Sequence, residues 1–320
     1  MTRSLLLSLI PLLLFLSSMS PLCSADSVAD RQFRNAVAQG DVAAARILLS
    51  NGADVDCRSE QGDTPLMIVA ENRNLEMARL LLEHGASVSA HDNDEDTALD
   101  EAARAFDTEM VRLLLAANPD QKDKDQSLNQ AAGDGPVILK AVEKSGAQQE
   151  QQGHNAPEPS WVTTVRLLLD SGANIEARNA EGDTPLLRAA AYGQTEIFQL
   201  LLERGAKMNV REKLGMTPLI AAACACAVAT MNGTYDILKI LLQNGVDVNA
   251  KDHDGRTALM LAASSPDDVS SVKLLLSHGA DPVLKDKDGH TALDYAVKAL
   301  RPDKAAVLRS AMLKTKVHTN

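Results

Sequence analysis

Aromatic side chains are scarce in this sequence. Four Phe, three Tyr and one Trp make up 2% of its 320 residues. A single large globular core usually contains more of these bulky side chains. The apolar content is mostly Ala and Leu instead, which suits a core divided into many thin layers.

Long hydrophobic runs are also lacking. The apolar run at residues 5–16 is interrupted twice and is shorter than the ~20 residues that a membrane-spanning helix needs. Arg3 precedes the run, and Cys-Ser-Ala at 23–25 places small residues where a signal peptidase cleaves. We therefore expect residues 1–25 to be a cleaved secretory signal peptide, with a retained anchor or lipidation of Cys23 as the alternatives.

Positive charge and cysteine are both in short supply. The formal net charge of −11 argues against general binding to nucleic acid or anionic lipid. After residue 25 only Cys57, Cys224 and Cys226 remain, and they do not form the even, regularly spaced set of a disulfide scaffold. We interpret all three as small buried apolar residues. The rival hypothesis is a redox role for these thiols.

Recognisable catalytic and metal-binding motifs are missing too. The seven His include no close pair with metal-site spacing, and the sequence has no phosphate-binding glycine loop, no GxSxG elbow and no paired CxxC. The segments DHDG (252–255) and DKDG (286–289) resemble calcium loops but lack a Glu at the twelfth position, so turns capped by Asp side chains explain them better. We expect no enzyme activity, no cofactor and no metal.

What the sequence does contain is a repeat. Its units align on a threonine at positions 64, 97, 184, 217, 257 and 291, with intervals of 33 residues in two places and 34 in a third. A closing glycine lies 12 residues before each of these threonines, at positions 52, 85, 172, 205, 245 and 279. A fixed period of this size predicts a solenoid.

Each part of the unit has a physical role, as the segment 182–206 illustrates. Thr184 is a helix N-cap, and Pro185 fits the first helical turn. The Leu two residues after the Thr points inward, and a pair of small residues lets helices approach closely. A second helix carries three consecutive Leu, and Gly205 ends it in a left-handed conformation. The segment 246–255 then predicts a projecting hairpin-like turn.

This pattern resembles the ankyrin repeat, a 33-residue unit of two antiparallel helices and a β-turn, over roughly residues 30–313. The resemblance implies an all-α ankyrin-repeat solenoid of about eight helix-turn-helix units with projecting β-turns, similar to bacterial periplasmic ankyrin-repeat proteins. One departure is consistent, because the family often has His after Thr-Pro-Leu. Here that position holds other residues, so we expect the turns to lose a stabilising contact: Met67, Asp100, Leu187, Ile220, Met260 and Asp294.

Two units are expected in degenerate form. Arg31 takes the Thr position in the first unit, and Gln126 takes it in the fourth. The fourth unit would carry an insertion at about 133–160. Residues 135–147 could instead be the second helix of a separate unit followed by a truncated one, and the sequence leaves both possibilities open.

The domain boundaries follow from this alignment. We expect the array at residues 26–313, a smaller insertion at about 226–233, and a C-terminal tail at 314–320. A closing helix should begin near Pro302, with Lys304, Arg309 and Lys314 turned to solvent.

The candidate binding residues lie on the hairpin tips and inner helices, because such arrays commonly bind partners on a concave face. Acidic tip residues would steer a partner: Glu60, Asp63, Asp94, Asp96, Glu181 and Asp183. Tyr192, Leu214 and Met216 would form an apolar anchor. The alternative is that the charged tips only maintain solubility.

Taken with the resemblance, these features predict an exported, monomeric scaffold in the periplasm or outside the cell that binds a protein partner of unknown identity. The alternatives are an envelope stress or redox-protection protein that uses its thiols, and an immunity-type binder that neutralises a toxin.

Overall fold

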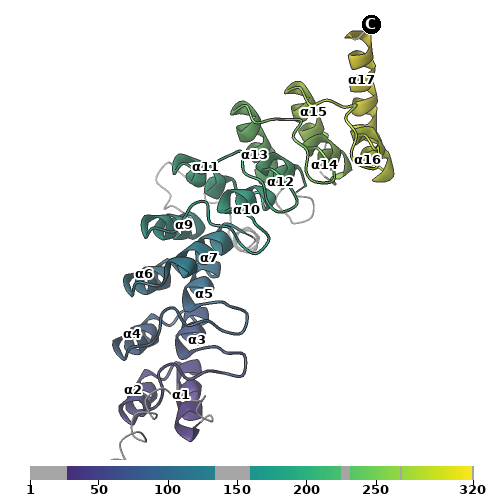
Figure 1. The fold of residues 1–320 in the computed structure, drawn as a ribbon. Coiled ribbons are helices and arrows are strands. Elements are labelled where there is room, and N and C mark those ends of the chain that lie inside the picture. The colour runs from purple at the N-terminus through teal and green to yellow at the C-terminus, as the bar shows by residue number, and fades with distance from the viewer. Residues whose placement is uncertain (1–26, 134–158, 225–230, 267–268, 319–320) are drawn as a thin grey trace, which may run out of the picture.

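The chain folds into a curved stack of helix pairs in a computed structural model (Figure 1). The structure describes residues 27–133, 159–224, 231–266 and 269–318. These ranges contain sixteen helices and no strand, apart from one isolated β-bridge between Lys251 and Thr257. The expectation of an all-α repeat solenoid is therefore confirmed.

The helices form two layers, with one helix of each pair in each layer. Inner helices pack mainly on inner helices of the neighbouring pairs, and outer helices on outer ones. The inner layer consists of α1 (Val28–Ala38), α3 (Pro65–Glu71), α5 (Ala98–Arg104), α7 (Gln121–Ala131), α10 (Pro185–Ala191), α12 (Pro218–Cys224), α14 (Ala258–Ser264) and α16 (Ala292–Lys298). The outer layer consists of α2 (Val42–Ser50), α4 (Leu75–Glu83), α6 (Thr108–Ala116), α9 (Ser160–Asp170), α11 (Thr195–Glu203), α13 (Met231–Gln243), α15 (Ser270–Ser277) and α17 (Pro302–His318).

The repeated residues start and stop the helices as the sequence predicts. Thr184 precedes α10 and its hydroxyl accepts a hydrogen bond from the Leu187 N–H at 3.4 Å, while Pro185 occupies the first turn. At the end of α11, Gly205 has a φ of 90°, and the Ala206 N–H reaches back to the Leu201 carbonyl at 2.9 Å. These bonds satisfy backbone groups that a helix end otherwise leaves unpaired.

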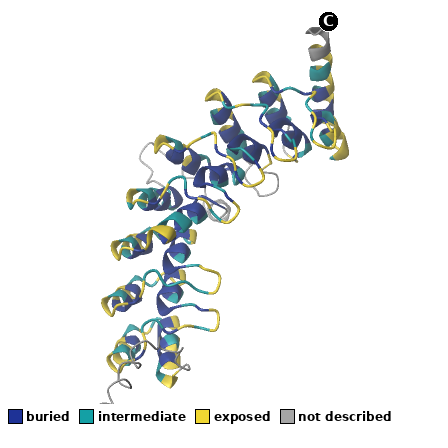
Figure 2. Cartoon of the chain, in the orientation of Figure 1, coloured by how far each residue is buried: buried dark blue, intermediate teal, exposed yellow. Residues whose placement is uncertain are grey.

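The core runs continuously between the two layers (Figure 2). The Leu that follows each Thr-Pro or Thr-Ala pair is almost fully buried in five units and partly buried at Leu293. Ala189 and Ala190 are buried as well, so neighbouring inner helices can pack closely. Each layer is thin, which explains why so few aromatic side chains suffice.

The first unit begins earlier than the sequence alignment placed it. Helix α1 starts at Val28, and its cap is Ser27, whose hydroxyl accepts a bond from the Asp30 N–H at 3.0 Å. Arg31 therefore lies inside the helix, and its expected role at the Thr position is wrong. Phe33, expected at the Leu position, is fully buried.

The fourth unit also differs from the alignment. Gln126 lies in the middle of α7, which starts five residues before it, so Gln126 is not a cap. Helix α7 packs against α5, α9 and α10, and α9 packs against α6, α7 and α11. The α7–α9 pair therefore occupies the place of one unit. The expected helix at 135–147 and most of both expected insertions lie outside the described residues.

The last helix corrects two further expectations. Helix α17 continues to His318, beyond residue 313 where the array was expected to end. Lys304 is fully buried rather than turned to solvent, because its Nζ donates to the carbonyl of Ala262 at 2.8 Å and to the carbonyl and hydroxyl of Ser265 at 3.0 Å. The Lys304 cation therefore lies at the negative end of α14 and joins α17 to it. Arg309 and Lys314 are exposed as expected.

None of the helices in the described ranges has the length and apolar character that a membrane crossing requires.

Candidate functional site

The concave side of the stack carries a row of hairpins beside the inner helices (Figure 1). Six units have such a hairpin before their inner helix, and we number each hairpin by its unit: hairpins two, three, five, six, seven and eight. They span residues 58–63, 91–96, 178–183, 211–216, 251–256 and 285–290, each ending just before its repeat Thr. Unit four has none, because α7 begins directly after Asp120.

The hairpins share one construction. In hairpin five the Asn179 N–H donates to the Asp183 carbonyl at 3.1 Å, and the Asn179 side-chain oxygen accepts from the N–H groups of Glu181 and Asp183. Asp252 and Asp286 make the same turn in hairpins seven and eight. The side chains of the DHDG and DKDG segments thus cap their own backbone, as the sequence suggested.

Neighbouring tips are joined by main-chain hydrogen bonds. The Lys213 N–H donates to the Glu181 carbonyl at 3.4 Å, and the His253 N–H donates to the Leu214 carbonyl at 2.8 Å. Matching bonds join hairpin three to hairpin two, and hairpin eight to hairpin seven. Within the part of the chain that the structure describes, the tips therefore form two fixed rows, one on each side of unit four.

A basic residue six positions before each repeat Thr adds a second set of links. Arg178 Nη1 donates to the Gly182 carbonyl of its own hairpin at 2.6 Å and to the Arg211 carbonyl of the next at 2.8 Å. Arg211 repeats this pattern with Gly215 and Lys251, at 2.7 and 2.8 Å. We call this series of links the basic ladder. Sequence reasoning missed it, although its period is visible once the units are aligned.

Three of the predicted acidic residues project freely, and three do not. Glu60, Asp94 and Glu181 are exposed at the tips. The other three lie half-buried at the bases of their hairpins: Asp63, Asp96 and Asp183. The Asp63 carboxylate accepts a bond from Ser59 at 3.0 Å, and Arg104 lies 2.5 Å from the carboxylate of Asp96. Burial raises the pKa of Asp183, with the Arg188 cation opposing it. Of the six, only Glu60, Asp94 and Glu181 can therefore offer an unshielded charge to a partner.

The predicted apolar anchor is smaller than expected. Leu214 is 60% exposed at the tip of hairpin six. Met216, expected to be exposed, is partly buried and packs on the core, at the position where its carbonyl accepts the Glu212 N–H and closes the hairpin. Tyr192 is half-buried at the end of α10, with the Arg188 guanidinium 5.4 Å from its ring centre. Leu214 is thus the exposed member of the three.

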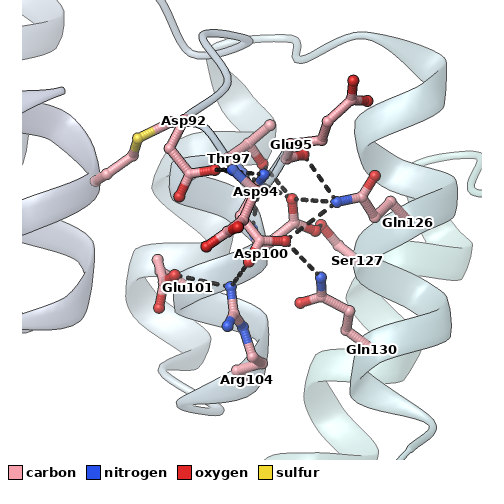
Figure 3. Close-up of polar contacts among 12 residues, drawn as sticks. Asp92, Asp94, Glu95, Thr97, Asp100, Glu101, Arg104, Gln126, Ser127 and Gln130 are labelled. Atoms are coloured by element: carbon pink, nitrogen blue, oxygen red, sulfur yellow. Dashed lines mark hydrogen bonds and ion pairs between the residues drawn. The ribbon is translucent and has the colours of Figure 1, made fainter. Parts of the chain in front are cut away.

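A buried carboxyl that the sequence did not single out as a site joins units three and four (Figure 3). Asp100 is fully buried between α5 and α7. It accepts bonds from the Thr97 N–H and hydroxyl, each at 2.8 Å, from Ser127 at 2.7 Å and from Gln126 at 3.2 Å. Burial raises its pKa to about 6, although the bonds from Ser127 and Thr97 oppose the rise.

Asp100 and Asp294 also correct the expectation that replacing the family's His loses a contact. Each carboxylate accepts a bond from the N–H and the hydroxyl of the Thr that begins its helix, with N–H distances of 2.8 Å to Thr97 and to Thr291. The Asp100 N–H also donates back to the Thr97 hydroxyl at 3.3 Å, and both helix starts form capping boxes, so both turns keep a stabilising contact.

The three thiols do not behave alike. Cys57 is buried, and desolvation raises its pKa to about 11, which leaves it protonated and unreactive at neutral pH. Cys224 is exposed at the end of α12, contrary to the expectation that it is buried, because the helix stops at that residue. Cys226 lies outside the described residues.

One group of side chains has a geometry that a metal could use. Ligand atoms of Asp286, Asp288 and His290 lie within 4.8 Å of one another. One oxygen of Asp286 already accepts two backbone N–H groups, and the other accepts the Tyr295 hydroxyl at 2.8 Å. The arrangement is thus accounted for by the turn itself.

Comparison with known proteins agrees with this architecture. The family model described as "Ankyrin repeats (3 copies)" matches residues 33–125, 160–230 and 226–317, which is more than half of the chain. The unmatched residues between 125 and 160 coincide with the second half of α7 and the chain that follows it. A search of curated proteins returned no match.

Proposed function

Because the chain belongs to the ankyrin-repeat family, we propose that it is an exported scaffold that captures a protein partner on its concave face. Ankyrin repeats are generally protein–protein interaction modules. The observation that carries the proposal is the row of hairpin tips, which main-chain bonds and the basic ladder hold in fixed positions. A surface that is already ordered loses little conformational entropy on binding.

The tips also provide two kinds of contact. The exposed carboxylates of Glu60, Asp94 and Glu181 lie on hairpins two, three and five and would attract a basic partner segment. Leu214 offers an exposed apolar side chain on hairpin six, where a partner could bury it. Charges of this kind act mainly on the association rate, whereas a buried anchor acts mainly on dissociation.

Export to the periplasm or the cell exterior is proposed from the sequence of residues 1–25. Intact-mass analysis of the exported protein should find Asp26 at its N-terminus. A mass that retains residues 1–25, or a lipid on Cys23, would contradict cleavage at this point. We further propose that the array acts as a monomer, since one chain supplies the whole concave row.

The binding proposal can be tested with a charge-reversal variant. A partner is first captured from an envelope extract on the immobilised full chain and purified. Glu60→Lys, Asp94→Lys and Glu181→Lys are then combined in one variant. Partner association should slow and lose much of its salt dependence, because the steering charges are gone.

The matched control reverses three exposed glutamates on the outer helices: Glu76, Glu83 and Glu203. It changes the net charge equally but leaves the concave face intact. Association with the control should match the wild type under equal conditions. Equal slowing by both variants would indicate a net-charge effect, and unchanged kinetics in both would overturn the concave-face proposal.

A further inference from the structure

Hairpin three is strained where the other five hairpins are not. Two residues before each repeat Thr the backbone adopts a positive φ, and five hairpins place Gly there: Gly62, Gly182, Gly215, Gly255 and Gly289. Hairpin three instead has Glu95 with a φ of 66°. A side chain disfavours this conformation, so surrounding contacts must hold Glu95 in it.

Three side chains supply those contacts. The Glu95 carbonyl lies 3.1 Å from His91 Nδ1 and accepts a bond from Gln126 Nε2 at 3.0 Å. The Glu95 carboxylate pairs with Lys122 at 2.8 Å. Gln126 and Lys122 both belong to α7. The first turns of that helix therefore contact the strained hairpin on the side where a hairpin of unit four would otherwise lie.

His91 is the titratable member of the basic ladder. It stands six residues before Thr97, where hairpins two, five and six have Arg. Its Nδ1 makes the bond to its own hairpin that Arg178 and Arg211 make to theirs. In those hairpins the Arg also reaches the next hairpin, but unit four has no hairpin to reach.

The second ring nitrogen of His91 faces a carboxylate instead. Its Nε2 lies 3.5 Å from Asp123 Oδ1, and the Asp123 side chain is completely buried. Neither oxygen of Asp123 has a hydrogen-bond partner. A buried carboxylate without donors is costly unless a cation or a proton compensates it.

The geometry therefore requires an additional proton. The Glu95 carbonyl can only accept, so His91 Nδ1 must carry a hydrogen. A neutral ring would then turn the bare lone pair of Nε2 toward the Asp123 carboxylate, and the two would repel. One proton shared between Nε2 and the carboxyl removes this repulsion, and such a proton belongs to the pair rather than to either residue.

We propose that hairpin three is a proton-dependent element of the concave face: the proton shared by His91 and Asp123 keeps Glu95 in its strained conformation, and loss of that proton at higher pH releases the tip. The consequence for partner binding rests on the proposed function, because Asp94 and Glu95 are both exposed on this tip. The proton-dependent contact itself does not rest on it.

Other charged groups surround the pair. From hairpin two the Arg58 guanidinium donates to the His91 carbonyl, and from α5 the carboxyl of Asp100 lies close to the same cluster. On α7 the Lys122 cation is next to Asp123, and on hairpin three the Glu95 carboxylate faces Lys122. Arg58 and Lys122 are cations and Glu95 and Asp100 are carboxyls, so the test must follow His91 itself rather than the global pH response.

The test is nitrogen NMR of histidine side chains in the full chain, across about pH 5 to 9, the range that spans ordinary imidazole titration. His253 is the internal control, because it is exposed on hairpin seven. His91 should retain signals of a doubly protonated ring to a higher pH than His253, or show a proton held by Asp123 in the carboxyl carbon shift. Asp123→Asn should abolish the difference between the two histidines.

Amide hydrogen exchange supplies the structural readout. Protection factors in hairpin three should fall about tenfold as the proton is lost, while those of hairpin seven stay constant. His91→Arg should keep hairpin three protected at every pH, because Arg remains charged and occupies this position in neighbouring hairpins. Glu95→Gly should also remove the pH dependence, since it relieves the strain.

Two results would overturn the proposal. One is a His91 ring that titrates with His253 and is indifferent to Asp123→Asn. The other is hairpin-three protection that changes with pH equally in the wild type, His91→Arg and Glu95→Gly. Neither measurement needs a partner, so failure here is distinguishable from failure of the binding proposal.

Discussion

Replacing Asp100 with Asn should flatten the pH dependence of stability in the mildly acidic range. Burial raises the pKa of Asp100 from its ordinary 3.8 to about 6. A carboxyl with a raised pKa in the folded state favours folding while it is protonated. Its contribution is therefore fully present below 3.8 and is lost as the pH rises through about 6.

The size of the effect follows from the same two values. Each pKa unit corresponds to about 1.4 kcal/mol, so the full change is about 3 kcal/mol in the free energy of unfolding. Asn cannot titrate, and its contribution is the same at every pH. The measured quantity is the slope of stability against pH, because Asn also changes the hydrogen bonds to Ser127 and Gln126 at all pH values.

Asp294 provides a matched control with the opposite sign. It accepts the same two bonds from its Thr, but it is exposed, and those bonds lower its pKa. Its stabilisation is present above 3.8 and is lost as the pH falls through the lowered value. Asp294→Asn should therefore reduce the loss of stability in acid.

Urea unfolding followed by circular dichroism measures the Asp294 slope at several pH values from about 2 to 4, and the Asp100 slope at several pH values between about 4 and 7. Asp100→Asn should lose the decline in stability that the wild type shows as the pH rises through this range. The reasoning would be refuted if Asp100→Asn kept the wild-type slope, or if both variants shifted the slope in the same direction.

Three further predictions concern packing, the basic ladder and the thiols. Leu186→Ala should lower the free energy of unfolding by roughly 2–5 kcal/mol through lost burial and a cavity, whereas Gln199→Ala, at an exposed position, should change it by less than about 0.5 kcal/mol. Equal urea midpoints for the two variants would contradict the register of the units. Arg211→Met removes two hydrogen bonds and should lower amide protection in hairpins six and seven but not in hairpin two; uniform loss of protection would show that the ladder does not act locally. Cys57 should resist iodoacetamide at pH 7 in the native protein while the exposed Cys224 reacts, and mass spectrometry that found Cys57 alkylated first would contradict its buried state.

The features that the sequence predicted correctly are those set by local backbone rules. Thr184 caps α10 and Leu186 is buried because cap geometry and helical periodicity depend on residues only a few positions away. Gly205 adopts a positive φ for the same kind of reason. The repeat multiplies such local signals, so the whole fold class could be derived from them.

The sequence contains residues that argue against placing Gln126 at the Thr position of unit four. The alignment placed Gln126 at the Thr position, but Lys124 stands where most hairpins have Gly, and Gln121 stands where they have a capping side chain. Without those residues the segment forms no hairpin and joins α7 instead. A comparison of all turn positions, rather than of the Thr position alone, predicts this difference.

Other errors depended on contacts between distant parts of the chain. Lys304 is buried because the end of α14 offers it three acceptors, and helical periodicity does not reveal that neighbour. Met216 is partly buried where a hairpin closes, and Cys224 is exposed at the end of a helix, so residue type alone does not predict how exposed either side chain is. The sequence predicted which residues lie on the hairpins, while which of their side chains are exposed came from the structure.

The missing hairpin of unit four has a mechanical consequence. Hairpins two and three form one braced segment, and hairpins five to eight form another, but among the described residues no tip-to-tip main-chain bond joins hairpin three to hairpin five. We expect the inner rim to bend most easily at unit four, where only side-chain and helix contacts join the two segments. We therefore expect the spacing between these two braced segments to be the part of the concave face that changes most readily when a protein binds.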